Sequence, residues 1–158
     1  MLDNYIRIKE ILDIQSIRLG LEVNSKEECL KEMLILASKS GKVENLEAVS
    51  DAVYEREALM STGIGKGVAL PHCKTGKIET TVGAMAVLSK SIEYESIDGE
   101  PVNIVFLVLG LENNVGENLR LLSKVSRMLN NKKFREKLFA CTDAVEVLKI
   151  IDENHENF

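Results

Sequence analysis

Two long apolar runs dominate the hydrophobic pattern of this chain. Residues 82–88 and 102–109 hold almost only apolar side chains, interrupted once by Gly and once by Asn. Such runs are typical of strands that are buried on both faces of a sheet. The alternation over residues 17–23 predicts another strand, and residues 68–71 predict a short strand closed by a proline.

Short polar stretches connect these strands. Ile92 and Tyr94, followed by the turn sequence Asp-Gly-Glu-Pro at 98–101, predict an edge strand or hairpin between the two long runs. The segment 61–67 reads Ser-Thr-Gly-Ile-Gly-Lys-Gly. Because three glycines alternate there, we expect this segment to form no regular structure.

Helical periodicity accounts for most of the first third of the chain. The apolar cluster over residues 6–14 predicts a short helical turn. A longer helix is expected to begin at Ser25, whose hydroxyl caps while Glu28 reaches back to it, and to end at Gly41. A further helix is expected over residues 46–57.

The last third of the chain is also predicted to be helical. Asn114 and Glu117 resemble a capping pair that begins a long helix, Phe134 lies in a short one, and Thr142 begins the last. The apolar faces expected on the long and the last helix consist of Leu119, Leu122, Val125 and Leu129, and of Val145, Leu148 and Ile151.

Helices that alternate with doubly buried strands define the fold class. We predict an α/β fold with a mixed central β-sheet flanked by helices on both faces. The 158 residues include two prolines and no biased segment that could serve as a linker. One domain of this size buries enough surface to fold alone, so residues 1–158 are assigned to a single domain.

Composition excludes several classes of partner. The net charge is −5 without a basic block, only 4% of the residues are aromatic, and there is no Trp. Nucleic acid and anionic membranes are therefore not expected as partners. No run of about 18 apolar residues is present, so direct membrane insertion is not expected either.

The cysteines and the N-terminus bear on location. Cys29, Cys73 and Cys141 are odd in number and far apart, which is typical of reduced thiols rather than of disulfides or a zinc site. Residues 1–5 carry an early Asp and no basic region before an apolar run, unlike a signal peptide. We expect a cytoplasmic protein.

The glycine-rich segment is the first candidate for chemistry. Gly63, Gly65 and Gly67 could turn several backbone N–H groups toward one anion, an arrangement that suits a phosphoryl group. A Walker A loop is excluded because Lys66 is followed by Gly rather than Ser or Thr, and a dinucleotide fingerprint is excluded by its spacing and element order. A tight connection without a ligand is the alternative interpretation.

His72 is the second candidate, directly after Pro71, which restricts its placement. A neutral imidazole is a nucleophile that can hold a covalent phosphoryl group. Arg56, near the end of a predicted helix, could grip that phosphate with its guanidinium group. The structural alternatives are a buried histidine without chemistry and a cation that stabilises a helix end. His155 lies in a polar tail and is expected to be solvated.

Residues 56–74 resemble the active-site motif of the enzyme IIA domains of the fructose/mannitol type in the bacterial phosphotransferase system. The motif reads R-E-x-x-x-S-T-G-I-G-x-G-[IV]-A-[IL]-P-H, and the chain matches it at every fixed position. The likeness continues through residues 92–106 and into the helix from Leu119, so it covers essentially the whole chain. The standalone domain is most similar to the nitrogen-regulatory branch, enzyme IIA-Ntr.

The resemblance implies a histidine phosphocarrier that takes part stoichiometrically in phosphoryl transfer. His72 is the implied phosphoacceptor, and the donor is the phosphohistidine of HPr or of its nitrogen-branch paralogue. Arg56 is implied to stabilise the phosphoryl group. Neither a metal ion nor another cofactor is required, because the donor is already a high-energy phosphohistidine. The residues implied to form the phosphate-binding loop are Ser61, Thr62, Gly63, Gly65 and Gly67.

One position departs from the family pattern. Many members carry a second histidine where this chain has Asn118. An amide can donate a hydrogen bond to a phosphoryl oxygen but cannot become a cation. The leading hypothesis is therefore a carrier that regulates another protein. The alternatives are a sugar-specific enzyme IIA that passes phosphate to a cysteine of an enzyme IIB for fructose or mannitol, and a binding module that is never phosphorylated.

Overall fold

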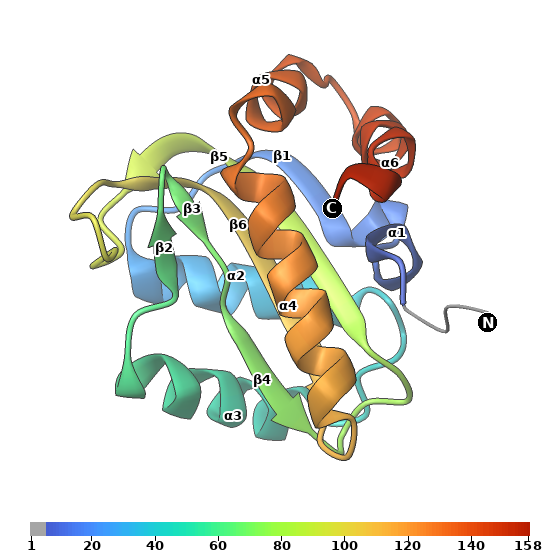
Figure 1. Ribbon diagram of the computed structural model, residues 1–158. Coiled ribbons are helices and arrows are strands. Elements are labelled where there is room, and N and C mark those ends of the chain that lie inside the picture. The colour runs from blue at the N-terminus through green and yellow to red at the C-terminus, as the bar shows by residue number, and fades with distance from the viewer. Residues whose placement is uncertain (1–5) are drawn as a thin grey trace.

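The computed structural model describes residues 6–158, so the prediction about residues 1–5 lies outside the described part. A mixed six-stranded sheet forms the centre, with the order β1-β5-β6-β3-β2 and with β4 also paired to β6 (Figure 1). Strands β5 and β6 pair antiparallel, whereas β1 runs parallel to β5, and β3 and β4 run parallel to β6. The strands are β1 (Ile17–Leu21), β2 (Gly63–Gly65), β3 (Val68–Ala69), β4 (His72–Thr75), β5 (Val82–Ile92) and β6 (Val102–Leu111).

Helices cover both faces of this sheet (Figure 1), as the α/β prediction requires. One apolar core lies between the sheet and α2 and α3, and a second lies under α1, α4, α5 and α6. Alternate residues of β6 belong to the two cores, which explains its uninterrupted apolar sequence: Leu107 faces the first and Phe106 the second. The helices are α1 (Ile8–Ile11), α2 (Lys26–Ser38), α3 (Leu46–Leu59), α4 (Val115–Asn130), α5 (Lys132–Ala140) and α6 (Ala144–Glu153), with short 3₁₀ turns at Ile14–Ser16 and His155–Asn157.

The start of α2 agrees with its expected cap in most respects. Ser25 Oγ accepts the backbone N–H of Glu28 at 3.1 Å. The Glu28 carboxylate, however, accepts the N–H of Asn24 rather than that of Ser25. The helix ends at Ser38, and Gly41, with φ of 75°, follows after a turn instead of closing the helix directly.

One prediction about the strands and loops was wrong. Residues 61–67 are partly regular, because β2 folds back onto β3 as a small antiparallel hairpin. The short strand expected before the proline is present as β3, and a further strand that was not predicted, β4, begins at His72 and pairs with β6. Between the two long runs the hairpin alternative is confirmed, since β5 continues to Ile92, which pairs with Val102 of β6, whereas no edge strand forms around the fully buried Tyr94.

The apolar faces of two helices also differ from those expected. Leu119 is 63% exposed and Val145 is 59% exposed, so neither packs on the sheet. Leu121 and Val147, two residues further along each helix, are buried instead. Helix α6 is capped by Asp143, whose carboxylate accepts the N–H of Glu146 at 2.8 Å, rather than by Thr142. Within residues 6–158, no helix is long and apolar enough to cross a bilayer.

Candidate functional site

An open hollow lies where the end of α3 approaches the start of α4, beside the first residues of β4. Its volume is about 650 Å³. The central residue of interest is His72, and we call this space the His72 hollow. Its lining consists of Ala52, Glu55, Arg56, Leu59, His72, Cys73, Lys74, Val108, Gly110, Val115, Asn118, Leu119 and Leu122.

His72 is half-buried and its ring is held in one orientation. Its Nδ1 lies 2.8 Å from the carbonyl oxygen of Leu70. A carbonyl can only accept, so Nδ1 carries the proton and the lone pair resides on Nε2. Burial lowers the pKa of His72 below its ordinary value of 6.5, and the charge of Arg56 adds to the lowering, whereas the hydrogen bond to Leu70 and the charge of Glu57 raise it in part. The ring is therefore neutral at pH 7, with Nε2 as a nucleophile.

Arg56 reaches the same hollow from the last turn of α3. Its Nη1 donates to the carbonyl oxygen of Met60 at 3.1 Å, which fixes the guanidinium group beside the helix end. The remaining donors of the guanidinium fork are suited to phosphoryl oxygens. The structure thus brings Arg56 and His72 together in one hollow, although they are 16 positions apart in the sequence.

Cys73 is a second potential nucleophile in the hollow. Burial raises the pKa of its thiol to about 12, so the thiol stays protonated at neutral pH. A protonated thiol is a poor nucleophile. His72 is therefore the more reactive of the two neighbouring side chains.

The glycine-rich segment does not line the His72 hollow. Gly63 packs against Ser96, and a Cβ there would lie 2.8 Å from the Ser96 Cα. Gly65, with φ of 99°, lies beside Asp98, whose carboxylate accepts the N–H of Lys66 at 2.9 Å. The carbonyl of Gly67 accepts from Asn103 at 2.9 Å. The segment is packed against residues 95–103, which corresponds to the interpretation as a tight connection.

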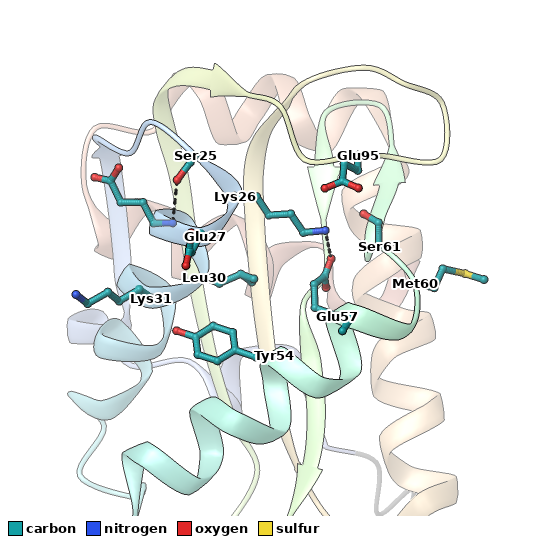
Figure 2. A pocket seen from close by; sticks show the side chains of 12 residues that line it. Ser25, Lys26, Glu27, Leu30, Lys31, Tyr54, Glu57, Met60, Ser61 and Glu95 are labelled. Carbon is teal, nitrogen blue, oxygen red and sulfur yellow. Dashed lines mark hydrogen bonds and ion pairs between the residues drawn. The ribbon is translucent and has the colours of Figure 1, made fainter.

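Ser61 and Thr62 also lie outside the lining of the His72 hollow. Thr62 is buried, and its N–H and hydroxyl both donate to the Glu57 carboxylate. Ser61 lines a second hollow of about 940 Å³ between α2 and the end of α3 (Figure 2). We call it the Lys26 hollow, and Figure 2 shows Lys26 reaching from α2 to Glu57 across it.

Asn118 is part of the His72 hollow and is only 6% exposed, in the first turn of α4. Its Nδ2 donates to the carbonyl oxygen of Leu111 at 2.9 Å, while its Oδ1 is buried without a hydrogen-bond partner. The side chain lies directly over Gly110, where a Cβ would come within 2.4 Å of Oδ1 and clash. One of the two amide N–H donors is thus used within the fold.

The sequence analysis missed the apolar rim of the His72 hollow. Leu59 is 81% exposed, Leu119 63% and Val115 50%. Exposed apolar side chains that gather around a polar centre mark protein interaction sites. The sequence contained one signal for this rim: Leu59 follows the expected end of the helix over residues 46–57. Leu119 gave no such signal, because its spacing predicts the buried face of its helix.

Comparisons with known proteins identify the class. The family model described as "Phosphoenolpyruvate-dependent sugar phosphotransferase system, EIIA 2" matches residues 10–154. Since this match covers nearly the whole chain, the chain belongs to the type 2 EIIA family of the phosphotransferase system.

Particular relatives come from two branches. A nitrogen regulatory protein of Bradyrhizobium diazoefficiens is 36% identical over 146 residues, which cover 91% of this chain and 94% of that protein. The fructose-specific EIIABC component of Bacillus subtilis is 32% identical over 149 residues, but the chain spans only 24% of its length. The crystal structure of the nitrogen regulatory protein IIA-Ntr from Neisseria meningitidis matches with a TM-score of 0.85 at 34% identity, covering 91% of this chain and 98% of that one.

Proposed function

We propose that this chain is a histidine phosphocarrier in which Nε2 of His72 accepts a phosphoryl group from a phosphohistidine of HPr or its nitrogen-branch paralogue. The observation that carries the proposal is the orientation of one ring. The Leu70 carbonyl holds the proton on Nδ1, which leaves the Nε2 lone pair as the nucleophile in the hollow that Arg56 also lines. Membership of the EIIA family supports the same reaction.

The transfer needs only alignment and charge stabilisation from the protein. The Nε2 lone pair forms a new N–P bond while the N–P bond of the donor breaks, and its electron pair stays on the donor nitrogen. The proton on Nδ1 remains in place, so the phosphorylated ring of His72 carries positive charge that the Leu70 carbonyl stabilises. Arg56 stabilises the negative charge on the equatorial phosphoryl oxygens.

A protein donor must dock over the hollow, and the apolar rim suits such docking. Leu59, Val115 and Leu119 surround the reacting group with side chains that lose water on contact with a partner. The donor and this carrier would meet in the cytoplasm. A phosphoryl group adds about −1.5 to −2 charges to this surface, so it changes the affinity of any regulated protein that binds there.

The regulatory role is favoured over sugar transport by similarity to nitrogen regulatory proteins. One of them is 36% identical to this chain, and the crystal structure of another matches it with a TM-score of 0.85. A sugar-specific role, with an enzyme IIB cysteine as acceptor, is the second candidate because the fructose-specific component of Bacillus subtilis is also similar to this chain.

The experiment is phosphorylation with purified enzyme I, HPr and phosphoenolpyruvate. We expect wild type and His155→Ala to gain one acid-labile phosphate, and His72→Ala to gain none. Wild type without phosphate would leave the binding module as the function, particularly if His72→Ala kept full affinity for a regulated partner. Rapid transfer from phosphorylated wild type to a fructose-type enzyme IIB would instead favour the sugar-specific role.

A further inference from the structure

A buried carboxylate lies next to Arg56 in the sequence but outside the His72 hollow. Glu57 is 7% exposed at the end of α3. Its carboxylate accepts the backbone N–H of Thr62 at 2.9 Å and the Thr62 hydroxyl, and it forms an ion pair with Lys26 Nζ at 2.9 Å. The Glu57 carboxylate therefore connects the first turn of α2, the last turn of α3 and Thr62, which directly precedes the β2–β3 hairpin.

The same hydrogen bonds continue to His72 through the backbone. The carbonyl of Thr62 accepts the N–H of Leu70 at 2.9 Å. The carbonyl of Leu70 in turn accepts Nδ1–H of His72 at 2.8 Å. The Glu57 carboxylate thus holds Thr62 in place, and the Thr62 carbonyl holds the backbone of Leu70. The Leu70 carbonyl in turn determines the orientation of the His72 ring.

Lys26 and Tyr94 contact each other and the Glu57–Thr62 pair. The Lys26 ammonium lies 4.7 Å from the centre of the Tyr94 ring, and the Tyr94 hydroxyl lies 3.2 Å from Thr62 Oγ1. Figure 2 shows the Lys26–Glu57 pair at the wall of the Lys26 hollow. The ion pair and the two bonds from Thr62 hold the buried Glu57 carboxylate in one position.

Stability alone is a weak reason for such a pair. Removing two charges from water costs about as much as their attraction returns, and apolar residues of similar size often stabilise a fold equally well. What a buried, fully hydrogen-bonded pair supplies is a single defined geometry. Phosphoryl transfer depends on such geometry, since misplacing a reacting group by about 1 Å costs on the order of 100-fold in rate.

We propose that Glu57, held in place by Lys26, is a positioning residue for phosphoryl transfer at His72. It acts through Thr62 and Leu70 on the imidazole, and through the end of α3 on the neighbouring Arg56. This inference rests on the proposed function and adds to it a part of the molecule that touches neither the phosphoryl group nor the donor.

The test compares Glu57→Gln and Lys26→Met with Asp51→Asn, an exposed acid on the same helix, as the matched control. For Glu57→Gln we expect phosphoryl transfer from phosphorylated HPr to slow by about tenfold or more at saturating donor. The KM for the donor should stay unchanged, because this variant leaves the apolar rim of Leu59, Val115 and Leu119 intact. The nitrogen chemical shifts of His72 should show a loss of the Nδ1–H tautomer, which a change in stability alone would not produce.

Thr62 provides a second pair of variants for the case in which Glu57→Gln does not fold. Thr62→Val removes the hydroxyl contacts to Glu57 and Tyr94 but keeps the backbone bond to Glu57. Thr62→Ser keeps the hydroxyl, so the serine variant should retain the wild-type rate and tautomer. Folded variants at Glu57 and Thr62 with wild-type rate and tautomer would overturn the inference while leaving wild-type phosphorylation, and so the proposed function, intact. A wild-type protein that accepts no phosphate would overturn both.

Discussion

At the scale of single residues, one hydrogen bond decides which nitrogen of His72 carries the lone pair. The Leu70 carbonyl assigns the proton of His72 to Nδ1 and leaves Nε2 as the nucleophile. The sequence shows Pro71 directly before His72, and it shows Arg56. It does not show the hydrogen bond between His72 and the Leu70 carbonyl, because the orientation of the ring depends on how the preceding backbone turns.

The lowered pKa of His72 leads to a prediction about pH. Burial and the Arg56 charge hold the pKa below 6.5, and only the neutral ring accepts a phosphoryl group. The midpoint of the acid fall in the acceptance rate should therefore lie below pH 6.5, and the rate should be level at higher pH. Stopped-flow transfer at several pH values measures this profile.

Removing the Arg56 charge should change that profile in a defined direction. In Arg56→Ala the pKa of His72 rises, so the rate begins to fall at a higher pH than in wild type. The rate on the level part should also drop by about 100-fold, since a donor to the transition state is lost. An unchanged rate and profile would show that Arg56 only caps the Met60 carbonyl.

At the scale of elements, close packing between β6 and α4 places Asn118. Gly110 leaves the space that the Asn118 side chain occupies, and the glycine hairpin of β2 similarly fits against Ser96. The sequence predicted β6 and α4 but not the β2–β3 hairpin. It left the hairpin glycines between a phosphate loop and a tight connection and gave Gly110 no role, because the residues that oppose these glycines are distant along the chain.

Gly110→Ala tests the contact between β6 and α4. The new Cβ would lie 2.4 Å from Asn118 Oδ1, so Asn118 must move and release the Leu111 carbonyl. We expect a loss of about 1–3 kcal/mol in the free energy of unfolding in urea. Gly76→Ala is the matched control, since its Cβ meets only the flexible end of Glu112 and should cost much less.

Gly63→Ala separates the two interpretations of the glycine hairpin. Its Cβ would meet the Ser96 backbone at 2.8 Å, so we expect a stability loss of about 1–3 kcal/mol. The transfer rate of the fraction that remains folded should stay close to wild type. A large loss of rate with unchanged stability would instead support a phosphate-binding role for this hairpin.

At the scale of the whole molecule, the last turn of α3 and the start of α4 border the same His72 hollow, and their exposed side chains form its apolar rim. Leu119→Glu should raise the KM for phosphorylated HPr by about tenfold, because an apolar contact is replaced by a charge. Its melting temperature should match that of wild type, since Leu119 is exposed. Val145→Glu, equally exposed but on α6, is the control, and an equal effect of both variants on KM would argue against this rim.

The sequence by itself determined the α/β class, the two doubly buried strands, the Ser25 cap and the family with its candidate nucleophile. These follow from periodicity, capping chemistry and a contiguous motif, all of which involve residues within a few positions of one another. Only the tertiary structure decided that the glycine hairpin packs on residues 95–103, that Leu119 is exposed at the His72 hollow, and that Glu57 bonds to both Lys26 and Thr62. Each of those depends on contacts between residues far apart in the chain, which form only when the sheet aligns its strands and helices.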